Sequence, residues 1–178
     1  GSTVQLQVDG VNSGNACTAN STTGVWSCDT GVLTDGDKVI TAVSTTVLND
    51  STVTSTSSGL TVTVDTTAPT VSMSASSSTL NSGQNSTLTF TLSEASTMFV
   101  VSDISASGGT FSSFAGSGTS YTVVFTPYAN FVSFAWLSVS TGKFTDAAGN
   151  SNTASSTIVI EYDTEVPTVS YVTSSSTN

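Results

Sequence analysis

A short segment that occurs twice constrains the fold of this chain more than any other feature of its sequence. Asp65-Thr-Thr-Ala-Pro-Thr70 returns 98 residues later as Asp163-Thr-Glu-Val-Pro-Thr168. Each copy follows a run of alternating apolar and polar residues, and extended sequence (Val71-Ser-Met73 and Val169-Ser-Tyr171) follows each copy. Because proline is excluded from central strand positions, the segment is interpreted as a stiff linker between the last strand of one domain and the first strand of the next. The spacing equals the length of one β-sandwich domain.

Between the two copies, apolar residues recur with a period of two, as they do in strands with one buried face. Turn residues such as Gly108-Gly109 separate these runs, and no helical period is present. The expected extended stretches are 88–92, 99–104, 121–125, 134–139 and 158–162. The fold class is therefore predicted to be all-β, with tandem immunoglobulin-like β-sandwich domains. Aromatic residues of these strands, such as Phe90, Phe125 and Trp136, are expected to pack in the core.

The first domain is predicted to be incomplete. Its expected strands are Thr3–Val8, which ends at the turn Asp9-Gly10, then Lys38–Val47 and Leu60–Val64. Only 64 residues precede Asp65, whereas the repeat period requires about 97 for a sandwich domain of this size, so two opening strands are missing. The expected boundaries are 1–67 for the incomplete domain, 68–166 for a complete domain, and 167–178 for the first strand of a following domain or a donor strand.

The two cysteines flank a cluster of turn residues. Cys17 and Cys28 lie on either side of Asn20-Ser-Thr-Thr-Gly24. If the turn centres near Thr22 and Thr23, two short strands place the cysteines opposite each other, where a disulfide can form. The hypothesis is a disulfide that links the two strands of a hairpin, in a protein that folds in an oxidising, extracytoplasmic setting. Two reduced structural thiols are the alternative.

The charge balance excludes several functions. The chain has 12 acidic residues, two lysines, no arginine and no histidine, which gives a net charge of −10. Nucleic-acid binding needs clustered basic residues and is not expected.

No apolar run reaches the roughly 18 residues of a membrane helix, so membrane insertion is not expected either. Without histidine, Ser-His and Cys-His nucleophiles cannot exist. Paired carboxylates could still hydrolyse glycosides, but the acidic residues occupy turns and linkers and no aromatic cleft is evident, so no enzyme activity is expected.

Several motifs together resemble a known family. They are Gly1–Gly10, Trp26, Asp35-Gly36, the stretch 126–131, Phe144-Thr-Asp-Ala-Ala-Gly-Asn150 and the two proline-containing linkers. This set is similar to the bacterial Ig-like repeats of large surface adhesins and biofilm-associated proteins. The resemblance implies a β-sandwich, an extracellular location on the bacterial cell surface, and often Ca²⁺ at domain junctions. The paired cysteines depart from the family pattern. Asn49-Asp50-Ser51 also departs from it, because it stands where the first domain would carry an Asp-Ala-Ala-Gly-Asn loop.

The order of strands in such a sandwich predicts where a calcium ion would bind. The loop after the second strand and the loop before the last strand both lie at the end where the chain enters the domain. These loops carry Glu94 and Asp146, and the entering linker carries Asp65. We expect these carboxylates to converge at the junction of the two domains, with Asn150, carbonyls or water completing an oxygen shell for Ca²⁺. Asp103 is a weaker candidate ligand, and Asp163 would serve the next junction. The alternative is that these residues belong to ordinary solvated turns.

The predicted function is that of a calcium-rigidified spacer in an adhesin or surface fibre, which serves cell adhesion or biofilm formation beside neighbouring repeats of the same polypeptide. One alternative is a head-to-tail filament, in which the strand from Val169 to Val172 of one copy fills the open sheet edge of the next. Another is a glycan-binding module that uses the loop aromatics Tyr128, Phe131 or Trp26.

Overall fold

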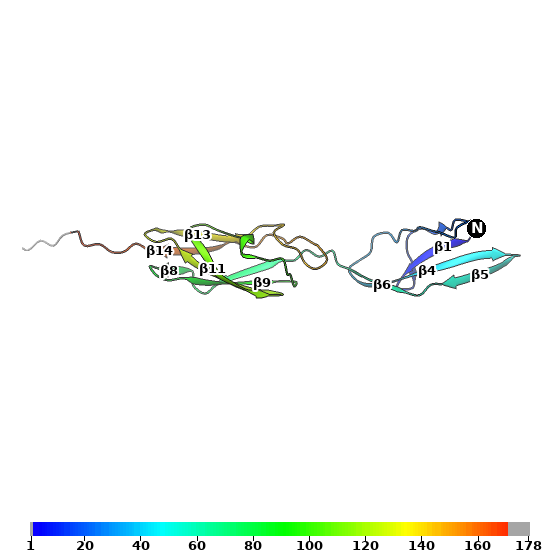
Figure 1. Cartoon of the computed structure of the whole chain (residues 1–178), viewed down its shortest axis with the longest axis horizontal. Coiled ribbons are helices and arrows are strands. Elements are labelled where there is room, and N and C mark those ends of the chain that lie inside the picture. The colour runs from blue at the N-terminus through cyan, green and yellow to red at the C-terminus, as the bar shows by residue number, and fades with distance from the viewer. Residues whose placement is uncertain (1, 171–178) are drawn as a thin grey trace, which may run out of the picture. The chain divides into compact units, whose positions relative to one another are not determined.

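The chain divides into two compact units, which meet between Thr67 and Ala68. The computed structural model describes residues 2–170, and these form strands and loops with a single three-residue 3₁₀ helix, Val101–Asp103. The all-β prediction is confirmed. Val169 and Ser170 are not part of a strand, and the rest of the expected final strand, from Tyr171 onward, lies outside the described residues. Figure 1 shows the strands of each unit.

The first unit is built around one long strand. Its six strands are β1 (Thr3–Val8), β2 (Val11–Asn12), β3 (Cys17–Thr18), β4 (Gly36–Leu48), β5 (Ser51–Thr56) and β6 (Leu60–Val64). β4 pairs antiparallel with β1, β5 and β6, while β1 also pairs with β2 and β3. β1 and β6 have the bounds that the alternation predicts. β5 was not predicted, because its serine and threonine residues give no apolar period.

Two tight turns fix the register of this sheet. Asp9 and Gly10 have φ values of 53° and 81° and connect β1 to β2. Asn49 and Asp50 have φ values of 49° and 63° and connect β4 to β5. Asn, Asp and Gly tolerate this left-handed backbone and so favour two-residue hairpins. The segment at Asn49 is therefore a hairpin turn and not a counterpart of the Asp146 loop.

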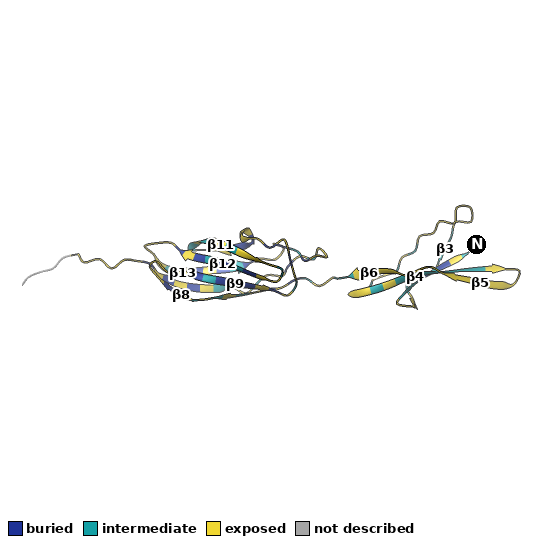
Figure 2. Cartoon of the chain, turned by 60° about the horizontal axis from the view of Figure 1, so that its bottom comes forward, coloured by how far each residue is buried: buried dark blue, intermediate teal, exposed yellow. Residues whose placement is uncertain are grey.

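The first unit has a small core because its described strands form one sheet. Val4 and Leu6, which are 3% and 6% exposed, are the buried apolar side chains of this sheet. The other strands are mostly half-buried or exposed, as the teal and yellow bands of β4 and β5 show (Figure 2).

The second unit is a sandwich of two four-stranded sheets. Its strands are β7 (Val71–Ala75), β8 (Thr79–Asn81), β9 (Ser86–Leu92), β10 (Ile104–Ala106), β11 (Gly109–Ser117), β12 (Ser120–Pro127), β13 (Val132–Val139) and β14 (Ile158–Asp163). One sheet has the order β11-β12-β9-β7 and the other β10-β13-β14-β8, in which β14 and β8 are parallel. The predicted stretch 99–104 is extended only in part, because the 3₁₀ helix interrupts it.

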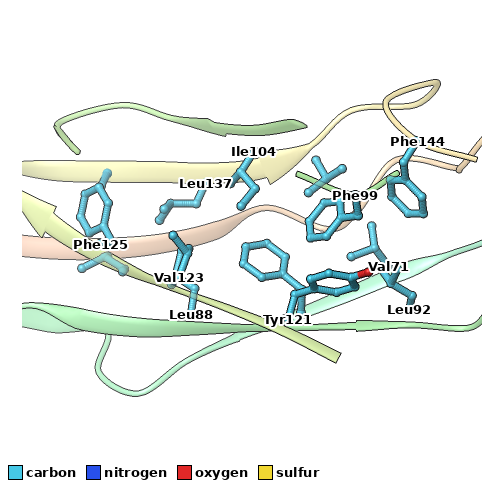
Figure 3. Close-up of a cluster of buried hydrophobic side chains, with 14 of the residues drawn as sticks. Val71, Leu88, Leu92, Phe99, Ile104, Tyr121, Val123, Phe125, Leu137 and Phe144 are labelled. Carbon is cyan, nitrogen blue, oxygen red and sulfur yellow. The ribbon is translucent and has the colours of Figure 1, made fainter. Parts of the chain in front are cut away.

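The core of the second unit lies between these sheets. One sheet contributes Leu88, Phe90, Val123 and Phe125, and the other contributes Ala135, Leu137, Val139 and Ile160, all of them fully buried. At one end, the ring of Phe99 lies among other aromatic rings, with centroids 5.2 Å from those of Tyr121 and Phe144 (Figure 3). Burial of each large apolar side chain contributes about 1.5–3 kcal/mol, so this cluster provides most of the stability of the unit.

The position of Trp136 corrects one prediction. Phe90 and Phe125 lie in the core as predicted, but the Trp136 side chain is 54% exposed. Its neighbours on β13, Ala135 and Leu137, are fully buried. Because successive side chains of a strand point to opposite faces, an inward Ala135 and Leu137 direct Trp136 outward.

Candidate metal centre

Three carboxylates from separate segments of the chain form a group of potential metal ligands. One carboxylate oxygen from each of Asp65, Glu94 and Asp146 lies within 4.8 Å of the other two. Asp65 and Glu94 are half-buried, and Asp146 is buried. These are the three residues that the topological argument expected to converge. Their arrangement depends on three loops, which hydrogen bonds hold together.

The first of these loops is the lead-in segment, residues 65–70, which runs from β6 into β7. The carboxylate of Asp65 accepts a hydrogen bond from the Thr67 backbone N–H at 3.0 Å, which bends the chain directly after β6. Pro69 is fully buried, and its carbonyl accepts the backbone N–H of Thr153 at 3.0 Å. The lead-in segment therefore has a defined path where it enters the second unit.

The second loop carries Glu94, and two serines position it. The Ser93 hydroxyl accepts the Thr70 backbone N–H at 2.9 Å, and the Ser93 N–H donates to the Thr70 carbonyl at 3.0 Å. Ser96 is buried and donates its hydroxyl proton to the Thr145 carbonyl at 2.6 Å. Ser93 thus joins the Glu94 loop to the lead-in segment, and Ser96 joins it to the residue before Asp146. Sequence reasoning missed both serines, because nothing in the strand pattern distinguishes them from the other serines of the chain.

The third loop holds Asp146 in a tight turn. The Asp146 carboxylate accepts the backbone N–H groups of Gly149 and Asn150 at 2.7 and 2.9 Å, and the Asn150 side-chain amide donates to it at 2.9 Å. Gly149 has a φ of 96°, a backbone conformation that glycine adopts without strain. Within the Asp-Ala-Ala-Gly-Asn motif, the glycine allows the turn and the asparagine orients the carboxylate.

This network also determines the charge of Asp146. Burial by itself would raise the pKa of the Asp146 carboxyl, but the hydrogen bonds from Asn150, Gly149 and Ala148 together lower the pKa below its ordinary value. Hydrogen bonds donated to a carboxylate favour its ionised form. Asp146 is therefore negatively charged at neutral pH, as a carboxylate that binds a cation must be.

A buried asparagine organises the base of the Asp146 loop. Asn152 is 1% exposed, and its side-chain oxygen accepts the backbone N–H groups of Lys143 and Phe144 at 2.7 and 3.0 Å. Its amide group donates to the carbonyls of Ser140 and Thr153 at 2.9 and 2.7 Å. A buried polar side chain needs such partners. Sequence reasoning missed Asn152 as well, since its role depends on burial.

The donor set fits a hard divalent cation. Ca²⁺ binds carboxylate oxygens at 2.3–2.6 Å, so two oxygens on one ion can be at most about 5 Å apart. The limit of 4.8 Å among the three carboxylates satisfies this condition. The chain has only two basic side chains against 12 acidic ones, so it has little positive charge of its own to balance such a cluster.

The other predicted ligands lie in different roles. Asn150 donates its amide to Asp146 and so acts as an orienting residue in this structure. Asp103 is buried, and its carboxylate accepts the backbone N–H of Val100 at 2.9 Å, which caps the 3₁₀ helix. Asp163 ends β14 and accepts the Glu165 backbone N–H at 3.1 Å. Within residues 2–170, neither Asp103 nor Asp163 belongs to a group of three potential ligands.

The predicted disulfide is present, but its setting differs from the expected hairpin. Cys17 and Cys28 are bonded, with their Cα atoms 5.7 Å apart. Cys17 lies in β3, which pairs with β1, whereas Cys28 lies in a segment without strand structure. The Asn20 carboxamide accepts the backbone N–H groups of Thr22 and Thr23 and forms the intervening turn. The disulfide therefore closes a loop and not a two-stranded ladder.

The aromatic residues considered for glycan binding are exposed. Trp26, Tyr128 and Phe131 are 42%, 50% and 55% exposed.

None of the helical structure in the described residues has the length or apolar character of a membrane-spanning helix.

Comparison with known proteins identifies the second unit. None of the curated proteins matches the chain. The family model described as the bacterial Ig-like domain matches residues 65–162. The matched range includes Asp65, Glu94 and Asp146. Domains of this family are typically extracellular and generally not enzymatic. The match covers more than half of the chain, which therefore belongs to the bacterial Ig-like domain family.

Proposed function

We propose that this protein is a structural spacer of an extracellular bacterial adhesin or surface fibre, and that Ca²⁺ bound by Asp65, Glu94 and Asp146 stiffens it. The observation that carries the proposal is the approach of these three carboxylates to within 4.8 Å. Its partners would be neighbouring repeats of the same polypeptide, and its role would be in cell adhesion or biofilm formation.

Electrostatics supports a bound cation. Three carboxylates at this distance repel one another, and the repulsion loosens the loops that carry them. A divalent cation reverses the sign of the interaction, so the same residues attract a common centre. Because the Asp146 turn is already ordered by its own hydrogen bonds, Asp146 would offer the cation a ligand in a fixed position.

The consequence for a spacer follows from the place of Asp65 in the chain. Asp65 directly follows β6, the last strand of the first unit, and precedes β7 by a few residues. A cation bound by Asp65, Glu94 and Asp146 would add a constraint to this connection. Without the cation, the hydrogen bonds of the lead-in segment, such as those between Thr70 and Ser93, would alone constrain this connection.

Small-angle scattering with and without Ca²⁺ tests the proposal. We expect the conformations fitted to the scattering curve to span a narrower range of maximum dimensions in calcium than in chelator. The variants Glu94→Gln and Asp65→Asn should each remove this difference. Asp50→Asn is the matched control, because it removes one negative charge from a hairpin turn of the first unit. Scattering curves that coincide with and without chelator would overturn the calcium role. A response that persists in Glu94→Gln would overturn the assigned site.

A further inference from the structure

The outer face of the sheet β10-β13-β14-β8 carries an aromatic surface that the calcium proposal does not use. Phe134 and Trp136 on β13 are 46% and 54% exposed, and Val132 and Val159 on the same face are 60% and 45% exposed. Trp136 pairs directly with Val159 across the two strands. The rings of Phe134 and Trp136 lie side by side along β13, with centroids 6.2 Å apart.

Polar side chains line one side of this surface. Phe134 pairs with Glu161, and Val132 pairs with Asp163. Glu161 and Asp163 pair in turn with Thr79 and Asn81 on β8. Because paired residues point to the same face of a sheet, the two aromatic rings lie beside two carboxylates, a hydroxyl and an amide. All four polar residues are exposed.

This combination suits a ligand that has both apolar faces and many hydroxyl groups. An aromatic ring packs against the C–H face of a sugar ring. An ionised carboxylate only accepts hydrogen bonds, and a sugar hydroxyl can donate them, while threonine and asparagine both donate and accept. The spacing of 6.2 Å along the strand is comparable with the repeat of one sugar unit in an extended polysaccharide.

Charge and size distinguish this ligand from other partners. The net charge of −10 repels a second copy, an anionic polysaccharide and an anionic lipid surface. A protein partner of standard size would need some 20–30 residues on each side, whereas the apolar surface consists of four side chains. The planes of the two rings differ by 47°, so a flat crystalline surface could contact only one of them, and a single twisted chain could contact both.

We propose that the outer face of this sheet binds a single chain of an uncharged polysaccharide across Phe134 and Trp136. The carboxylates Glu161 and Asp163 would accept hydrogen bonds from the hydroxyl groups along one edge of the chain. The site shares no residue with the carboxylate cluster, so binding is expected to be the same in calcium and in chelator.

Affinity electrophoresis tests this site in native gels that contain hydroxyethyl cellulose, soluble starch, galactomannan or dextran. We expect at least one of these polymers to retard the protein. The double variant Phe134→Ala/Trp136→Ala should bind about tenfold more weakly or worse, because losing a central aromatic contact has effects of this size. Both side chains are exposed, so the thermal unfolding transition should be unchanged. Trp26→Phe is the matched control and should be retarded normally.

Fluorescence provides a second readout. Trp26 and Trp136 are the only tryptophans of the chain, so in Trp26→Phe the emission reports on Trp136 alone and should change when the retarding polymer is added. Three outcomes would overturn the proposal. They are migration that none of the four polymers affects, retardation that persists in the double variant, and binding confined to poly-lysine or to crystalline cellulose.

Discussion

At the scale of single residues, Gly109 shows how closely the core of the second unit is packed. A Cβ atom at this position would lie 2.5 Å from ring atoms of Phe125 and 2.5 Å from the Thr126 carbonyl oxygen. Both neighbours are held in place, since Phe125 is fully buried and Thr126 is part of β12. Sequence reasoning placed a turn at Gly108-Gly109, and the structure adds that Gly109 begins β11 against the core.

We predict that Gly109→Ala lowers the free energy of unfolding of the second unit by about 1–3 kcal/mol, the usual cost of overpacking a core. Denaturant unfolding monitored by near-ultraviolet circular dichroism would measure the loss. Gly142→Ala is the comparison, because Gly142 faces open space and has a φ of 69°, so its substitution reports the cost of backbone strain without a packing clash. A loss at Gly109 no larger than at Gly142 would contradict the packing argument.

The carboxylate of Asp35 forms hydrogen bonds that hold the last residues of the first unit in place. Its carboxylate accepts hydrogen bonds from the hydroxyl groups of Thr66 and Thr67 at 2.7 and 2.8 Å, and from the Thr66 backbone N–H at 3.0 Å. The hydroxyl group of Thr66 and then that of Thr67 are the main causes that lower the pKa of Asp35.

The sign of the resulting pH dependence follows from linkage. Because the pKa of Asp35 is lower in the folded state, its contribution to stability is complete above the unfolded pKa of about 3.9 and is lost as the pH falls through the folded value. We predict that Thr66→Val together with Thr67→Val returns the pKa of Asp35 toward its ordinary value, as a carboxyl ¹³C NMR titration would show. Thr66→Ser with Thr67→Ser keeps both hydroxyl groups and should leave the pKa low. Equal titration curves for the two double variants would rule out the assigned cause.

At the scale of elements, the disulfide matters because the loop that it closes has no strand after β3. Residues 19–35 contain no strand, and few apolar side chains hold this segment to the sheet. The sulfur atoms lie beside β1, where both are within 3.7 Å of the Val4 carbonyl. The disulfide therefore holds this loop against β1, because few apolar contacts do so.

We predict that Cys17→Ser/Cys28→Ser destabilises the first unit by about 3 kcal/mol, the loop-closure value for a separation of 11 residues. The second unit should be unaffected, because it has its own core. Differential scanning calorimetry would show a lower transition for one unit and an unchanged transition for the other. Reduction of the wild-type protein should reproduce the shift, and a shift of both transitions would contradict the independence of the units.

The elements also show what the sequence could predict and what it could not. Alternation identified β9, β12, β13 and β14, because each has an apolar residue at every second position. Alternation cannot say which of the two faces is buried, and for this reason Trp136 was placed in the core. β8 is too short to show a period, and β11 is rich in glycine and serine. Pairing with β14 and β12 defines these two strands, and such pairing depends on distant residues.

The carboxylate cluster was accessible from sequence for a different reason. Strand order alone brings the loops of Glu94 and Asp146 to one end of a sandwich, so the topology sufficed to name both residues. The supporting contacts of Ser96 and Asn152 depend on burial inside loops, which no periodic pattern describes. The role of Asp103 as a helix cap depended on the 3₁₀ helix, which the extended reading of 99–104 did not include.

At the scale of the whole molecule, the stability of the protein should depend on the concentration of calcium. A ligand that binds only the folded state stabilises it by about 2.7 kcal/mol at a hundred times its dissociation constant. Bound Ca²⁺ should mainly stabilise the second unit, which carries Glu94 and Asp146. Among residues 2–170, the group of three potential ligands consists of Asp65, Glu94 and Asp146. The first unit contributes only Asp65 to it.

We predict that added Ca²⁺ raises the unfolding temperature of the second unit progressively, and that Glu94→Gln greatly reduces this rise. Differential scanning calorimetry at several calcium concentrations would measure it, with Na⁺ at equal ionic strength as the control for general screening. A rise of the same size in Na⁺ would mean that the protein responds to ionic strength and not to a bound ion.

The parallel pairing of β8 with β14 has a mechanical consequence for a protein that is held at both ends. β8 lies near the start of the second unit, and β14 lies at its end. Because the two strands run in the same direction, opposite pulls on the ends of the unit would slide one strand along the other. The hydrogen bonds between them, including the one from the Glu161 N–H to the Ser78 carbonyl, would then carry the force together and would not open one after another. This arrangement would resist tension, which is the load that the proposed spacer would bear.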